Sequence, residues 1–255
     1  LTEEFREYFN QKYSVDVMDS FHYKATGTVT TPIFSVDNMS FLTVPDDDSL
    51  SFINGNQVDV PFSFSIDLRL INDFANPTSA GGELIYLAAK GTAQTGNIEY
   101  IFALTNNNSQ VGGPIEYTVQ VFLLDTNGGG FQLLFGIPGI DFVSTSQQYV
   151  NIALTYDGSE TVDGISIYAN GTRFSSTYTV APGYQGMSNL SSDLIIGGSF
   201  DGSLKNATFY NKELTPEEVS RVYAGEVLDS AISRWKIDGN GNDSIGSNDG
   251  TLSAT

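Results

Sequence analysis

The chain has 255 residues, of which 40% are hydrophobic, and this length suits one large all-β domain or two small ones. With 11 Lys and Arg against 30 Asp and Glu, its net charge of −19 argues against nucleic acid and anionic membrane surfaces as partners, because both require a positive field. The chain has no cysteine, which excludes disulfides and thiolate chemistry, and no apolar run long enough to insert into a membrane. It starts at Leu1 without a signal segment, so we expect that residues before it were removed or left out.

Residues 1–27 differ from the rest of the chain. Leu1, Phe5 and Phe9 recur at helical spacing, and Thr2 is a suitable N-cap, so we predict a short N-terminal helix in an arm over 1–27. One such helix cannot bury its own aromatic stripe, so it packs either on its own domain or on a neighbour.

Short strand patterns follow, each bounded by Gly, Asn, Asp or Pro. The clearest is FSFSIDLRLI (62–71), in which apolar and polar residues alternate. Asn170-Gly171 predicts a hairpin with a type I′ turn. These features predict an antiparallel two-sheet sandwich or jelly roll. The other predicted strands are 83–90, 99–105, 115–125, 131–137, 149–157, 165–171, 172–180 and 193–200.

A second short helix is predicted near 215–224. Thr215 can cap it, Pro216 suits its first position, and Glu218 completes a capping box. Gly225 provides the stop. We expect this helix to cover one side of the sandwich rather than to carry catalysis.

The segments YVNIALTYDGS, GISIYANGTR and LIIGGSFDGSLKNATFYNKELTPEEVSRVY resemble, in this order, the laminin-G-like, concanavalin A-like jelly rolls. The resemblance covers roughly residues 33–225. It implies an all-β concanavalin A-like sandwich over 28–255 that recognises glycans or proteins through loops at one rim. Two departures are that Lys205 and Asn206 stand where the family has an acidic pair, and that Tyr149 stands near the place of a common Trp.

A third departure is at the C-terminus, where SRWKIDGNGNDSIGSNDGTLS (233–253) resembles the first strand of the family. Three explanations remain open: a circularly permuted jelly roll, the start of a truncated further repeat, or a strand that completes a partner's sheet. We favour closure within the same chain, with 231–255 supplying a displaced terminal strand.

The sequence gives little support for catalysis. Related hydrolases use spaced carboxylates on one strand, whereas Glu83 and Glu116 are isolated. The only histidine is His22, and no nucleophile elbow is present. We therefore expect a protein that is not an enzyme.

Calcium is the one cofactor that the sequence suggests. DGNGND places Asp238, Asn240 and Asn242 at alternate positions, but the later positions do not fit an EF-hand, and a polar turn is the simpler interpretation. In the resembled family calcium sits on loops with oxygen ligands. The candidate metal ligands on such loops are Asp37, Asn38, Asp46 and Asp201, with Asp47 and Asp48 beside them.

Ligand contacts are expected at Tyr184, Asn107 and Phe131, which we place on loops. Two functions remain. One is a non-catalytic module on an extracellular or virion surface that binds glycan or protein. The other is a structural virion component, such as a capsid decoration, knob or fibre protein of a phage or virus, that self-assembles or joins neighbouring structural proteins through its terminal arms.

Overall fold

The computed structural model describes residues 41–70, 84–92, 97–106, 117–125, 130–142, 148–176, 178–180, 183–198 and 202–253. The predicted N-terminal helix and arm (1–27) lie outside these residues. No helix among the described residues has the length and apolar character needed to cross a bilayer.

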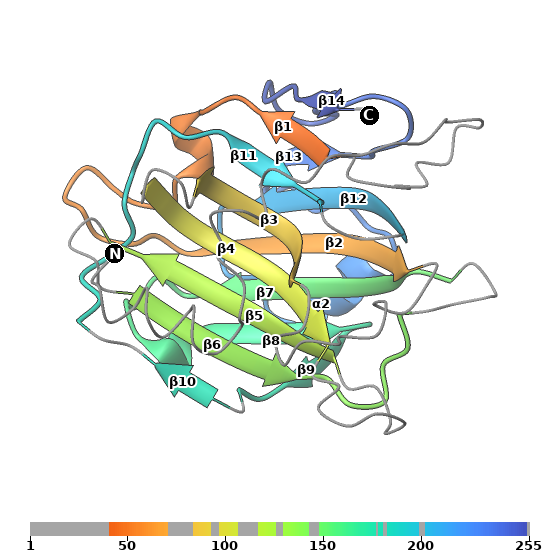
Figure 1. Ribbon diagram of the computed structural model, residues 1–255, viewed down its shortest axis with the longest axis horizontal. Helices are drawn as coiled ribbons and strands as arrows, with labels where there is room; N and C mark the ends of the chain where they lie inside the picture. The colour runs from red at the N-terminus through yellow and green to blue at the C-terminus, as the bar shows by residue number, and fades with distance from the viewer. Residues whose placement is uncertain are drawn as a thin grey trace.

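The described residues form two antiparallel sheets, as predicted for a concanavalin A-like sandwich. In Figure 1, strands β3 to β6 of the larger sheet cross in front of β12, β2 and β7 of the smaller one. The larger sheet has the order β10 (Tyr178–Val180), β6 (Gly130–Gly136), β5 (Tyr117–Leu124), β4 (Asn97–Asn106), β3 (Leu84–Thr92), β11 (Leu194–Ile196), β1 (Phe41–Val44), β14 (Thr251–Ser253). The smaller has the order β13 (Ala231–Trp235), β12 (Gly202–Tyr210), β2 (Phe62–Leu70), β7 (Val150–Tyr156), β8 (Ile165–Ala169), β9 (Thr172–Phe174).

Alternation along β2 decides which side chains fill the sandwich. Its apolar residues from Phe62 to Leu70 are buried between the sheets, while Ser63, Ser65, Asp67 and Arg69 alternate with them and face outward. Packed aromatic rings form part of the core. Phe52 stacks on Phe62 with 4.1 Å between ring centroids, and Trp235 meets the ring of Phe209 edge-on.

The predicted hairpin and the second predicted helix are both present. Asn170 and Gly171 have φ values of 49° and 76°, as a type I′ turn requires. Helix α2 (Pro216–Tyr223) has the predicted capping box between Thr215 and Glu218. Its apolar side, with Val219 and Val222, packs on outward-facing residues of the smaller sheet. Two short 3₁₀ turns, η2 (Asp48–Leu50) and η4 (Val162–Gly164), complete the described elements.

The prediction of one strand over 172–180 is wrong. β9 pairs with β8 in the smaller sheet, whereas β10 pairs with β6 in the larger one. The chain passes from one sheet to the other between them, so the run of strand-forming residues serves two sheets.

The C-terminal segment contributes to both sheets of its own chain. β13 pairs with β12, and β14 pairs with β1. Trp235 is fully buried, and its indole N–H donates to the carbonyl of Asn248 at 2.8 Å. The segment between β13 and β14 is therefore held against the sandwich through a core side chain.

Candidate functional site

Outward-facing polar residues gather on the smaller sheet, next to the end of helix α2. They line a partly open cavity of about 50 Å³. Such a space has room for about three to five water molecules, at about 10–15 Å³ each, or for the polar edge of a larger ligand. The lining comes from β2, β7, β12, β13, α2 and the loop after α2, namely Ser65, Asp67, Asn151, Asn206, Thr208, Tyr210, Val222, Tyr223, Gly225, Glu226, Val227 and Arg234. We refer to it as the outer-sheet pocket.

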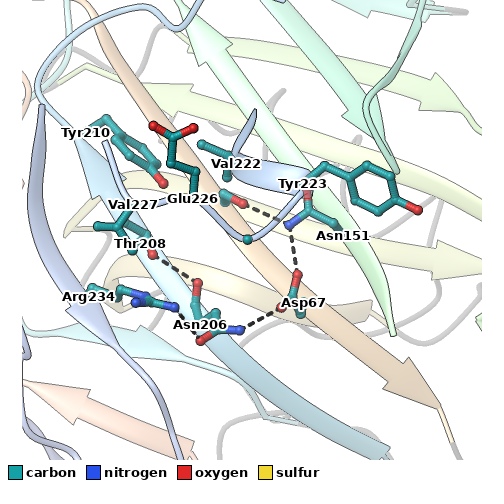
Figure 2. A pocket seen from close by; sticks show the side chains of 12 residues that line it. Asp67, Asn151, Asn206, Thr208, Tyr210, Val222, Tyr223, Glu226, Val227 and Arg234 are labelled. Atoms are coloured by element: carbon teal, nitrogen blue, oxygen red, sulfur yellow. Dashed lines mark hydrogen bonds between the residues drawn. The ribbon is translucent and has the colours of Figure 1, made fainter. Parts of the chain in front are cut away.

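Asn206 lies between Arg234 and Asp67 in the lining of the outer-sheet pocket (Figure 2). Its amide nitrogen donates to Asp67 Oδ2 at 2.8 Å, and its amide oxygen accepts from Arg234 Nη2 at 2.9 Å. Asn206 lies at an irregularity between β12 and β2 and has a φ of 55°. Asn tolerates this left-handed conformation better than most residues, and a bulge turns one side chain away from the regular alternation. The bulge therefore places an amide between a carboxylate and a guanidinium.

Asn151 also lines the pocket, beside Asp67. Its Nδ2 donates to Asp67 Oδ1 at 2.9 Å and to Ser65 Oγ at 3.0 Å. A carboxylate only accepts hydrogen bonds, so the contact with Asp67 identifies which amide atom is the nitrogen. The amide oxygen is buried and accepts no hydrogen bond from any described residue. A buried acceptor without a partner costs free energy that a bound donor recovers.

The rim of the pocket combines apolar surface with an ion pair. Tyr223 is 50% exposed and Val227 is 40% exposed. Glu226 pairs with Arg221, and this hydrogen bond lowers the pKa of Glu226 below its ordinary value. Tyr210 lies deeper, and burial raises its pKa to about 12, so its hydroxyl is neutral at physiological pH. The site thus offers hydrogen-bond donors and acceptors beside an exposed ring.

The predicted ligand residues Tyr184 and Phe131 lie together at another part of the sandwich. Their rings are 4.1 Å apart between centroids, and the Tyr184 hydroxyl donates to Asp59 Oδ2 at 2.6 Å. Burial and the Asp59 carboxylate raise the pKa of Tyr184 well above its ordinary value. Phe131 belongs to β6 and is only 3% exposed, so its prediction as part of a strand over 131–137 is confirmed and its placement on a loop is wrong. Asn107 lies outside the described residues.

Of the predicted metal ligands, only Asp46 is described; Asp37, Asn38 and Asp201 are not. The ammonium group of Lys90 lies 2.5 Å from Asp46 Oδ1 and 3.0 Å from Glu99 Oε1. Asp46 already has a cationic partner there. Within the described ranges no three Asp, Glu or His side chains are grouped as a metal would require.

The DGNGND segment forms a polar turn. Asp243 Oδ1 accepts from the backbone N–H of Arg234 at 2.9 Å and from those of Ile245 and Gly246, each at 3.0 Å. Its Oδ2 accepts from the N–H of Asn248 at 3.1 Å. The carboxylate therefore organises the loop between β13 and β14.

A family model described as the Concanavalin A-like lectin/glucanases superfamily, of laminin-G type, matches residues 74–220, more than half of the chain. No curated protein matches the chain. A solved structure from Bacteroides ovatus, described as a carbohydrate-binding protein, has a TM-score of 0.50 at 13% identity and covers 85% of this chain. The alignment spans 57% of that protein.

Two further solved structures are less similar. Tailspike protein 2 of an Escherichia coli O157:H7 bacteriophage has a TM-score of 0.46 at 15% identity, covering 81% of this chain and 26% of that one. The CBM40 module of the Ruminococcus gnavus IT-sialidase, bound to α2,6-sialyllactose, has a TM-score of 0.41 at 16% identity. The alignment covers 66% of this chain and 85% of that one. The likeness to the Bacteroides ovatus structure shows a shared fold, and the family model assigns the chain to a superfamily. The chain belongs to the concanavalin A-like lectin/glucanases superfamily.

Proposed function

We propose that the chain is a non-catalytic module that binds glycan through the outer-sheet pocket. The observation that carries this proposal is the combination of Asp67, Asn206 and Arg234 in one hydrogen-bonded group with the exposed ring of Tyr223 at its edge. Sugars present hydroxyl groups, which both donate and accept, and apolar C–H faces. A pocket with paired polar side chains and an aromatic edge complements both.

The free hydrogen-bonding capacity of the pocket supports this ligand class. The buried oxygen of Asn151 accepts from no described residue, so it suits a hydroxyl donor. Arg234 uses one of its five guanidinium N–H groups on Asn206, and others remain to donate to a sugar oxygen. The cavity admits only part of a sugar, so we expect the rest of the ring to lie against Tyr223 and Val227.

The carboxylates of the pocket suit recognition better than hydrolysis. Each oxygen of Asp67 already accepts from an amide, and Glu226 is held in an ion pair that lowers its pKa. A glycosidase needs one carboxyl group with a raised pKa to protonate the leaving oxygen. The similarity in fold to a protein from Bacteroides ovatus described as carbohydrate-binding adds to the proposal.

A glycan array followed by calorimetry tests the proposal. Asn206→Gly removes the amide and keeps the backbone, because glycine adopts a φ of 55° without strain. Tyr223→Ala removes the exposed ring. We expect each change to weaken binding at least about tenfold, as one lost hydrogen bond or stacked ring predicts. Val58→Ala, at a residue that is 44% exposed and outside the pocket lining, is the control.

Two results would contradict the proposal. An array that stays blank, with and without calcium, would rule out glycan recognition. Binding that survives Asn206→Gly but is lost in Asn107→Ala or Tyr184→Phe would place the ligand at the predicted loop residues. Calcium binding and a location on an extracellular or virion surface remain predictions, as does assembly through terminal arms. Light scattering of the intact chain and of one lacking residues 1–27 tests assembly.

A further inference from the structure

Beside the outer-sheet pocket, two cationic side chains approach one aromatic ring. Lys205 Nζ lies 3.9 Å from the centroid of the Tyr149 ring, and Arg69 Cζ lies 5.6 Å from it. Arg69 on β2 pairs in register with Ser203 on β12, so Lys205 is its diagonal neighbour across the two strands. All of these side chains are on the outer face of the smaller sheet, because core residues alternate with them.

Neither cation is neutralised by a carboxylate within the described part of the chain. The described ion pairs involve Lys90, Lys212 and Arg221. Lys205 is directly opposite Asp67, but both oxygens of Asp67 accept from Asn151 and Asn206. Lys205 and Arg69 therefore place two neighbouring positive charges on the outer face, although the chain as a whole has a net charge of −19.

The hydrogen bonds of Arg69 also leave some of its donors unused. Its Nη2 donates to Ser203 Oγ at 3.2 Å, a long contact with a neutral acceptor. Its Nε is buried and donates to no described residue. Guanidinium groups bind carboxylate, sulfate and phosphate oxygens through paired N–H groups. Arg69 thus retains donors for an oxyanion.

We infer that Arg69, Lys205 and Tyr149 form a subsite for an anionic group of the ligand, next to the outer-sheet pocket. This inference rests on the proposed function and extends it: the glycan carries a carboxylate or a sulfate on the residue adjacent to the one in the pocket. Lys205 and Asp67 are cross-strand neighbours, so the pocket and the subsite share one strip of the sheet. The negative charge of the whole chain is screened beyond about 8 Å at physiological ionic strength, so the nearest charges determine the sign of the electrostatic potential at the subsite.

Paired oligosaccharides test the subsite. We compare a glucuronate-containing, a sulfated and a neutral oligosaccharide of the same length by calorimetry at constant ionic strength. The charged ligands should bind about tenfold tighter, as expected for one charge-assisted contact. Lys205→Gln should remove this preference without weakening the neutral ligand. Lys236→Gln, an equal change of charge at an exposed residue outside the pocket lining, is the matched control.

The outcomes separate this inference from the proposed function. Equal affinity for charged and neutral ligands, or equal effects of Lys205→Gln and Lys236→Gln, would overturn the subsite and leave glycan binding intact. If no oligosaccharide binds, the proposed function fails, and inorganic sulfate becomes the probe. A sulfate-dependent shift of the Arg69 Nε–H resonance that Lys205→Gln abolishes would support the subsite alone. The absence of any such shift would overturn the subsite.

Discussion

Replacing Lys90 by Met should destabilise the fold strongly and in a pH-dependent manner. Lys90 and Glu99 are both fully buried, and their charged atoms are 3.0 Å apart. Lys90 Nζ also contacts Asp46 Oδ1 at 2.5 Å and donates to the carbonyl of Ser192 at 3.1 Å. Removing one partner of a buried ion pair typically costs about 3–5 kcal/mol, because the other charge stays buried without compensation.

Protonation of Glu99 sets an upper limit on that cost. Burial raises the pKa of Glu99 even with Lys90 present, and without Lys90 it rises further. Protonating a glutamate with an unfolded pKa of about 4.3 costs about 3.7 kcal/mol at pH 7 and about 1 kcal/mol at pH 5, at about 1.36 kcal/mol per unit. The free energy of unfolding of Lys90→Met should therefore fall by about 3–4 kcal/mol at pH 7. Most of this loss disappears by pH 5, since a raised pKa makes the variant relatively more stable as the pH falls.

Urea unfolding at pH 7 and pH 5 measures both quantities. The double variant Lys90→Met with Glu99→Gln should be more stable than Lys90→Met at pH 7, because no buried charge remains. Lys212→Met is the matched control, since its ion pair with Glu218 is partly exposed and should cost under about 1 kcal/mol. A loss below about 1 kcal/mol for Lys90→Met, or one of equal size at both pH values, would refute this reasoning.

Three further predictions concern the loops, the helix and the metal. Asp243→Ala should lower the free energy of unfolding by about 2–3 kcal/mol, because the carboxylate accepts four backbone N–H groups. Burial alone would raise the pKa of Asp243, but these hydrogen bonds lower it, so the whole stability difference from wild type should be present above about pH 4 and be lost as the pH falls through the lowered pKa. Urea titrations at pH 5 and pH 3 measure this difference. Thr215→Ala should cost about 1 kcal/mol by loss of the capping box, and thermal unfolding measures it against Thr215→Ser, which retains the cap. If calcium is bound, EDTA should lower the melting temperature, and an unchanged value together with no calcium uptake in calorimetry would contradict that prediction.

Features determined by neighbouring residues could be predicted from the sequence. The capping box of α2 involves Thr215 and Glu218, and the type I′ turn involves Asn170 and Gly171, so each depends on a few adjacent side chains. The inward face of β2 follows from alternation alone. The sequence predicts Phe131 both as the first residue of the strand 131–137 and, because of the glycines before it, as a loop residue; β6 begins at Gly130, so the strand prediction is the correct one.

The candidate site depends on strand register, which a single sequence does not reveal. Asp67, Asn151, Asn206 and Arg234 come from four strands, and only the pairing of β2 with β7 and β12, and of β12 with β13, brings them together. The buried ion pair of Lys90 and Glu99 could not be predicted either, because nothing in the order of residues indicates that both charged side chains are buried.

One sequence signal did point to the site. Lys205 and Asn206 occupy positions where the resembled laminin-G-like pattern has two acidic residues. In the structure, Asn206 links Asp67 to Arg234, and Lys205 lies over Tyr149. Acidic side chains at both positions would place carboxylates beside Asp67 and repel it, whereas the amide of Asn206 donates to Asp67 and Lys205 adds no negative charge. Where the resembled pattern has acidic side chains, β12 therefore carries a neutral and a cationic hydrogen-bond donor, Asn206 and Lys205. The proposed glycan contacts depend on these donors.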